Sequence, residues 1–263
     1  MPAVERLSFE DDTLLGGYAE TIVRLTFADP FCRGRRVLDA GCGTGLGSRY
    51  LREHGAESVL GIDNSDDAIR EARTLDATGS CEFQVGDLQE LDRVVANRGF
   101  GAIVCFETLP HLLEPGRFLS AVRGCLEADG TFVVSTPNRA AIPLDAQGRP
   151  EYEFQHAAYT PATLETLLLG YFNEVSLWGQ WLTPPGKLRQ GRAANQYRYL
   201  CESYYLPAAR FMRLAKRLFG RPALPPPENN AFSDAYPGDF EIAPVFPSRQ
   251  PWAPGVLLAI CRN

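Results

Sequence analysis

The chain has 263 residues, of which 45% are hydrophobic, so it can bury a full core as one domain with an elaboration. Its formal net charge of −6 at pH 7 argues against a general nucleic-acid binder, which needs a basic surface. The seven cysteines include no Cys-x-x-Cys pair, so we expect a cytoplasmic protein with reduced thiols and no metal site. No stretch is apolar enough to span a bilayer, so we expect no stable membrane insertion.

Residues 1–34 precede the first glycine-rich motif and contain apolar residues such as Ile22, Leu25 and Phe27, which predict a helix. Tyr18 is a candidate lid residue over a ligand pocket formed by the motifs that follow. A helix that is merely packed on the core fits the sequence equally well, so both interpretations stay open.

The run from Arg36 to Gly47 reads Arg-Val-Leu-Asp-Ala-Gly-Cys-Gly-Thr-Gly-Leu-Gly, and it is the most informative stretch of the chain. A short apolar strand ends at Asp39, and the chain then turns on glycines, which admit a ligand close to the backbone and accept positive φ. The helix that begins at Leu46 directs free N–H groups toward the same pocket, so a nucleotide-type ligand is predicted. Leu46 stands where a dinucleotide fingerprint needs its third glycine, and Asp39 would repel a pyrophosphate but suit an ammonium group. Both features disfavour a nicotinamide-dependent oxidoreductase.

Four further strands are predicted within residues 58–63, 81–88, 100–107 and 130–135, with helices over 66–75 and 115–126. Alternating strands and helices indicate a parallel sheet that is covered on both faces. Ligands in such sheets bind at the carboxyl ends of the strands. Asp63, Asp87 and Glu107 follow the ends of three of these strands, so together with Asp39 they are expected to face one pocket.

Over about residues 35–180 this order of motifs resembles the class I S-adenosylmethionine (SAM) methyltransferases, which have a Rossmann-like α/β sheet with an antiparallel last strand. Residues 106–112 and the Ser-Thr-Pro-Asn run at 135–138 resemble the ubiquinone O-methyltransferase branch, many of whose relatives act on sugars, lipid-linked glycans or natural products. The resemblance implies that SAM is the cofactor, with Asp63 on the ribose hydroxyls and Asp87 on the adenine amine. The implied cofactor-binding residues are Tyr18, Asp39, Gly41, Cys42, Gly43, Thr44, Gly45, Asp63, Asn64, Asp87, Leu88, Phe106 and Glu107. Pro110 stands where some quinone-type relatives carry a second Glu, so no metal is assigned.

Methyl transfer to a hydroxyl needs a base near the acceptor proton, whereas an amine only needs to arrive uncharged. His111, just past the fourth strand, is the first candidate for this base and His156 is the second, although His111 also fits a structural or helix-capping role. Asn138, Arg139 and Tyr159 are candidates for binding the acceptor. The function predicted is methylation of a hydroxyl or amine on a small molecule, namely a sugar, glycan precursor or natural product. A SAM-binding protein without methyl transfer is the alternative.

The sixth strand is predicted near residues 172–180 and the last strand at 256–263, so residues 181–255 form a proline-rich insertion that we interpret as a substrate cap. From Pro184 to Glu228 the insertion holds nine Lys or Arg and two Glu, and residues 204–221 are predicted to form a basic amphipathic helix. Such a helix fits a solvated face, contact with an anionic acceptor, or a membrane surface.

Overall fold

The computed structural model describes residues 15–142 except residue 97, residues 155–182, 240–245 and 254–263, and the single positions 145, 147, 148 and 150. The chain divides into two compact units, and the described residues of the larger unit lie within Thr21–Trp181 and Glu241–Asn263. The predicted basic helix at 204–221 and most of the predicted cap lie outside the described residues. Among the residues that are described, no helix is both long and apolar enough to cross a membrane.

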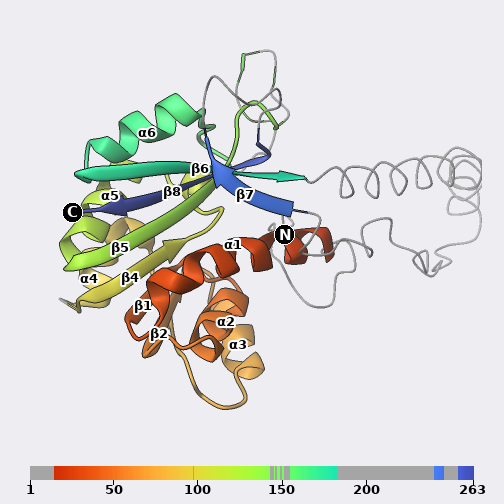
Figure 1. The fold of residues 1–263 in the computed structure, drawn as a ribbon. Helices are drawn as coiled ribbons and strands as arrows, with labels where there is room; N and C mark the ends of the chain where they lie inside the picture. Colours follow the sequence, from red (N-terminus) through yellow and green to blue (C-terminus); the bar gives the residue numbers. More distant parts are fainter. Residues whose placement is uncertain are drawn as a thin grey trace, which may run out of the picture. The chain divides into compact units, whose positions relative to one another are not determined.

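The larger unit is built on a sheet of eight strands in the order β3-β2-β1-β4-β5-β8-β6-β7 (Figure 1). The strands are β1 (Arg36–Ala40), β2 (Ser58–Asp63), β3 (Glu82–Val85), β4 (Phe100–Cys105), β5 (Leu126–Pro137), β6 (Glu174–Leu182), β7 (Phe240–Pro244) and β8 (Val256–Arg262). Strands β1 to β5 pair in parallel, whereas β8 runs antiparallel to both β5 and β6. The predicted Rossmann-like sheet with an antiparallel last strand is therefore confirmed.

The helices occupy the connections between strands, as the alternating pattern predicts. They are α1 (Leu15–Cys32), α2 (Leu46–Glu53), α3 (Asp66–Leu75), α4 (Leu91–Val95), α5 (Pro115–Cys125) and α6 (Pro161–Leu169), with short 3-10 helices η2 (Leu88–Glu90) and η3 (Leu109–His111). Ser65 caps α3 through its side chain and Thr160 caps α6 with Pro161 following it, so both helices begin where the sequence predicts.

Two boundaries differ from the sequence prediction. Strand β5 begins at Leu126, directly after α5, because residues that precede the Asp129-Gly130 pair already join the sheet. Strand β7 lies inside residues 181–255, where the sequence analysis predicts no strand. Its five residues extend the sheet beyond β6 to the edge, where a proline is tolerated because one side of the strand needs no partner.

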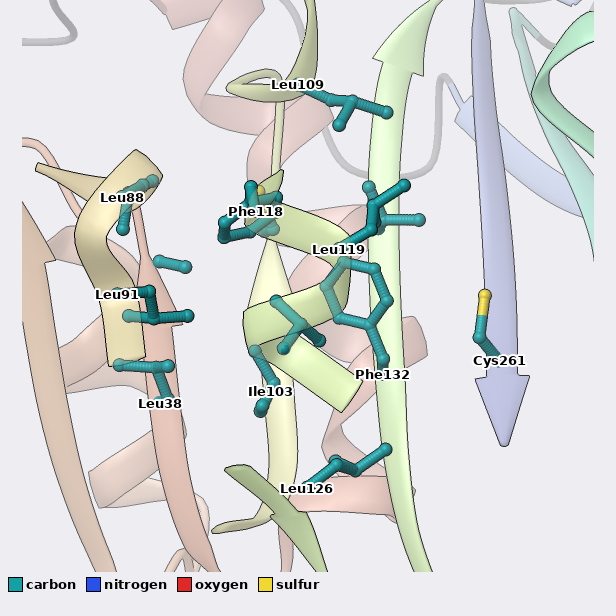
Figure 2. Close-up of a cluster of buried hydrophobic side chains, with 14 of the residues drawn as sticks. Leu38, Leu88, Leu91, Ile103, Leu109, Phe118, Leu119, Leu126, Phe132 and Cys261 are labelled. Carbon is teal, nitrogen blue, oxygen red and sulfur yellow. The ribbon is translucent and has the colours of Figure 1, made fainter. Parts of the chain in front are cut away.

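The core has one layer on each face of the sheet. Figure 2 shows Phe118 and Leu119 of α5 lying over Ile103 of β4 and Phe132 of β5. The rings of Phe118 and Phe132 meet edge-on with their centroids 6.3 Å apart. On the opposite face, Leu25 of α1 packs with side chains of β1, β4 and β5. Burying one side chain of this size contributes about 1.5–3 kcal/mol to the free energy of folding. The two layers therefore stabilise the sheet whose strand ends carry the predicted site residues.

Candidate cofactor and acceptor site

The glycine turn after β1 contains one position that opens onto free space. A Cβ on Gly41 would collide with the side chain of Thr108, whereas a Cβ on Gly43 would meet no atom within 4 Å. Both glycines have positive φ, 85° at Gly41 and 52° at Gly43. The N–H groups of Gly41 and Cys42 donate to the carbonyl of Ile62 at 2.8 and 3.0 Å, which fixes the turn against β2. The turn at 41–43, which we call the cradle, is thus fixed against β2, and its open side lies at Gly43.

Asp63, at the end of β2, lies beside this cradle. Its Oδ2 accepts a hydrogen bond from the N–H of Gly43 at 3.0 Å, and its Oδ1 accepts one from the N–H of Ser65 at 2.9 Å. An ionised carboxylate offers about four acceptor positions, so the two oxygens keep capacity for ribose hydroxyls. The open side of Gly43 and this oriented carboxylate fit the cofactor that the resemblance implies.

Asp39 is placed differently from Asp63. The residue is only 6% exposed, and its Oδ2 accepts a hydrogen bond from the hydroxyl of Ser48 in α2 at 2.7 Å. Burial raises the pKa of Asp39 to about 6; the hydrogen bond from Ser48 opposes this shift and the nearby charge of Asp63 adds to it. Asp39 therefore anchors the first turn of α2 beneath the glycine turn, a role that the sequence did not reveal. Its contact with the cofactor stays a prediction.

The remaining residues predicted for the nucleoside side lie around the same strand ends. Asp87 caps η2 by accepting the N–H of Gln89 at 2.9 Å, and its side chain is exposed. Leu88 is buried in the core, whereas Asn64 is exposed. Cys42 and Thr44 are buried, and burial raises the pKa of the Cys42 thiol. Tyr18 lies in α1, but its side chain is outside the described residues.

The loop after β4 brings Phe106, Glu107 and Thr108 to the same edge of the sheet. Thr108 lies against Gly41, since its side chain occupies the space that a Cβ there would need. The Glu107 carboxylate accepts a hydrogen bond from the hydroxyl of Ser135 at the end of β5, with 2.6 Å between the oxygens. Phe106 is partly buried against the hydrophobic cluster of the α1 face.

The two candidate bases come from segments that touch. The N–H of His156 donates to the carbonyl of Pro110, the residue before His111, at 2.8 Å. His111 ends η3 and is partly exposed, and His156 is exposed. The structure therefore brings both predicted bases to one region beyond the carboxyl ends of β4 and β5, which we call the rim. Among the described residues no cluster of three or more His, Cys, Asp or Glu could hold a metal ion.

The three residues predicted to bind the acceptor are adjacent, but two of them are buried and hydrogen-bonded to the backbone of neighbouring segments. Asn138 is 1% exposed, and its amide donates to the carbonyl of Pro254 at 2.9 Å. Tyr159 is buried, which raises its pKa, and its carbonyl accepts the N–H of Arg139 at 2.7 Å. Arg139 is the partly exposed member of the group. Contact of these residues with an acceptor remains a prediction.

A buried polar pair at this edge of the sheet has no counterpart in the sequence prediction. The guanidinium of Arg24 in α1 donates to the side chain of Gln180 in β6 at 2.9 Å, and both residues are buried. The two residues are 156 positions apart. No local pattern marks such a pair, because it exists only once α1 and β6 have been brought together.

A family model described as a methyltransferase domain matches residues 16–189, which is more than half of the chain. The chain belongs to the class I SAM-dependent methyltransferases. SAM is its cofactor. That the glycine turn and Asp63 hold the cofactor stays a prediction.

Individual relatives agree with this assignment. The ubiquinone biosynthesis O-methyltransferase of Neisseria meningitidis serogroup C (strain 053442) is 29% identical over 122 residues, which cover 44% of this chain and 51% of that protein. The chain thus spans about half the length of the curated relatives it matches.

Solved structures share the fold. A SAM-dependent methyltransferase from Mesorhizobium loti is 20% identical with a TM-score of 0.53, and the match covers 95% of this chain and 100% of that chain. The plantazolicin methyltransferase BamL, solved with S-adenosylhomocysteine (SAH), is 17% identical with a TM-score of 0.53 over 95% of this chain and 85% of that chain.

Proposed function

We propose that this methyltransferase transfers the methyl group of SAM to a hydroxyl or amine of a small molecule, namely a sugar, a glycan precursor or a natural product. The observation that carries the proposal is the meeting of the His111 and His156 segments, joined by the hydrogen bond from His156 to Pro110. This junction lies beyond the ends of β4 and β5, and the Ser-Thr-Pro-Asn run at 135–138 spans the end of β5.

Methyl transfer is an in-line displacement, so much of the acceleration comes from aligning the nucleophile with the methyl group in a pocket that excludes water. SAM, when bound, supplies a methyl group on a positively charged sulfur. In our proposal Asp63 holds the ribose hydroxyls, and the glycine turn admits the rest of the cofactor at Gly43. For a hydroxyl acceptor, His111 removes the proton as the new bond forms, with His156 as the second candidate.

We further propose that the acceptor is anionic. The support is compositional: nine Lys or Arg against two Glu lie between Pro184 and Glu228, in the segment expected to form the cap. A phosphate or diphosphate group would gain charge-assisted hydrogen bonds from such a segment.

The first experiment is calorimetric titration of the full chain with SAM, SAH and NADH. We expect micromolar binding of the two adenosyl ligands and no heat with NADH. Nucleotide-diphosphate sugars, matching neutral sugars and phenolic natural products are then screened by measuring SAH formation from SAM. SAH formation with the diphosphate sugars and not with the neutral ones would support the anionic acceptor. SAM binding without turnover of any acceptor would favour the alternative of a non-transferring SAM-binding protein.

A further inference from the structure

Glu107 has a backbone conformation that its residue type rarely adopts. Its φ is 56°, and in the described part of the chain the one other non-glycine residue with positive φ is Ala96 at the end of α4. A left-handed conformation is unfavourable for a residue with a Cβ, because the Cβ comes too close to the following carbonyl oxygen. At Ala96 this conformation ends a helix, which is its common use. Glu107 ends no helix, and strain at a strand end beside the proposed cofactor site points to a functional constraint.

Ser135 holds Glu107 in this conformation through both its backbone and its side chain. The N–H of Glu107 donates to the Ser135 carbonyl and lies at the same 3.2 Å from the Ser135 hydroxyl, while that hydroxyl donates to the Glu107 carboxylate at 2.6 Å. Ser135 is fully buried. A short bond between a buried hydroxyl and a carboxylate is among the stronger hydrogen bonds in proteins.

These bonds determine toward which strand of the sheet the carboxylate is directed. Strand β4 lies between β1 and β5 in the sheet. The side chain of Thr108 meets Gly41, beside β1, whereas the side chain of Glu107 meets Ser135 on β5. The nucleoside side of the site, with Asp63, belongs to β1 and β2. Glu107 is therefore turned away from the nucleoside and toward the rim where the histidine segments meet.

We infer that the Glu107 carboxylate faces the position of the transferring methyl group and accepts a hydrogen bond from an N–H or O–H group of the acceptor next to the reacting atom, and that Ser135 is a positioning residue that keeps it there. This inference rests on the proposed function, because it assumes that SAM binds at the glycine turn. The sequence analysis predicts that Glu107 binds the cofactor, whereas this inference assigns it to the acceptor side of the site.

The inference can be tested without knowing the acceptor. Sinefungin resembles SAM but carries a protonated amine where SAM carries its sulfonium methyl group, whereas SAH carries nothing there. A carboxylate at that position makes the wild-type chain bind sinefungin more tightly than SAH. Because a hydrogen bond to a charged group contributes about 1.5–3 kcal/mol, Glu107→Gln should reduce the ratio of sinefungin to SAH affinity about 10- to 100-fold. Ser135→Ala should reduce this ratio about 2- to 10-fold and leave SAH affinity almost unchanged.

Two further variants serve as controls. Thr136→Val removes a buried hydroxyl from the next residue of β5, which does not bond Glu107 in the structure, and should leave the ratio unchanged. Ser135→Cys keeps a weak donor of similar size and should give a ratio between wild type and Ser135→Ala, which tests the positioning role even if the alanine variant folds poorly. Equal affinity of the wild-type chain for sinefungin and SAH would overturn the inference, as would parallel losses of both ligands in Glu107→Gln or in both Ser135 variants. Failure to bind SAH at all would instead overturn the proposed cofactor site, so the two failures are distinguishable.

Discussion

The two halves of the site are built by different means. Around β1 and β2, backbone groups make the key contacts: the N–H of Gly43 meets Asp63, and the N–H of Gly41 meets Ile62. Around β4 and β5, a side-chain hydroxyl holds a strained residue, as Ser135 does with Glu107. In our proposal the backbone cradle binds the cofactor, which is common to the family, and the side chains around β4 and β5 face the acceptor, which differs between members. The comparison predicts that variants of the first half affect cofactor binding and variants of the second half affect turnover.

The largest expected effect is on the cradle. Gly43→Val should abolish SAH binding, because a branched side chain would fill the open space beside the turn and strain its positive φ. The matched control is Gly79→Val, since Gly79 has a φ of 62° and a Cβ added there would also meet nothing within 4 Å. Both variants should lose stability in thermal unfolding, but only Gly43→Val should lose SAH binding by calorimetry. SAH binding retained in Gly43→Val would remove the cofactor from this turn.

The second prediction addresses the acceptor half. His111→Ala should lower kcat about 10²- to 10⁴-fold on a hydroxyl acceptor, as expected for loss of a general base, and should change SAH affinity less than about twofold. His54→Ala is the control, because His54 stacks on Tyr50 at the end of α2. Steady-state kinetics on the acceptor found by screening provides the measurement. If kcat is unaffected, either another residue acts as the base or the acceptor is an amine.

The third prediction concerns Asp39, which is buried beneath the cradle and accepts the hydrogen bond from Ser48. Its folded-state pKa of about 6 lies above the ordinary value of 3.8, so folding favours its protonated form. The carboxyl group therefore destabilises the folded state progressively as pH rises from about 4 to 6. Since one pKa unit corresponds to about 1.4 kcal/mol, the effect is at most about 3 kcal/mol.

Asp39→Asn removes this titration and can still accept the bond from Ser48. The variant should gain stability relative to wild type between about pH 4.5 and pH 7, measured by urea unfolding of the SAH-free chain. Parallel stability curves for the two proteins would show that Asp39 does not carry the raised pKa.

The smallest expected effect is that of Asp63→Ala. Loss of a carboxylate that pairs with ribose hydroxyls should weaken SAH binding by about 1–3 kcal/mol. Asp66→Ala, at an exposed position in the first turn of α3, is the matched control. An unchanged SAH dissociation constant in Asp63→Ala would assign the ribose to another residue.

Local patterns explain which parts of the fold were predictable. The glycine spacing at 41–45 and the apolar runs before Asp63 and Glu107 depend on neighbours in the chain, so the sheet class and the pocket-side loops followed from the sequence. Helix α3 has the predicted bounds, Asp66–Leu75, because Ser65 supplies a local cap. Strand β7 was missed because its pairing with the edge of the sheet is not a local property.

The sequence by itself determined the family, the cofactor and the order of the strand-end carboxylates, since each depends on short motifs of fixed spacing. Only the tertiary structure separated these carboxylates from one another. Asp39 is buried under α2, Asp63 is held open beside Gly43, and Glu107 is turned toward β5. Their burial and partners come from strands and helices that are distant in the chain: Ser135, for example, lies 28 positions after Glu107. Packing, which no local pattern encodes, therefore decided the burial and the hydrogen-bond partners of each acidic residue.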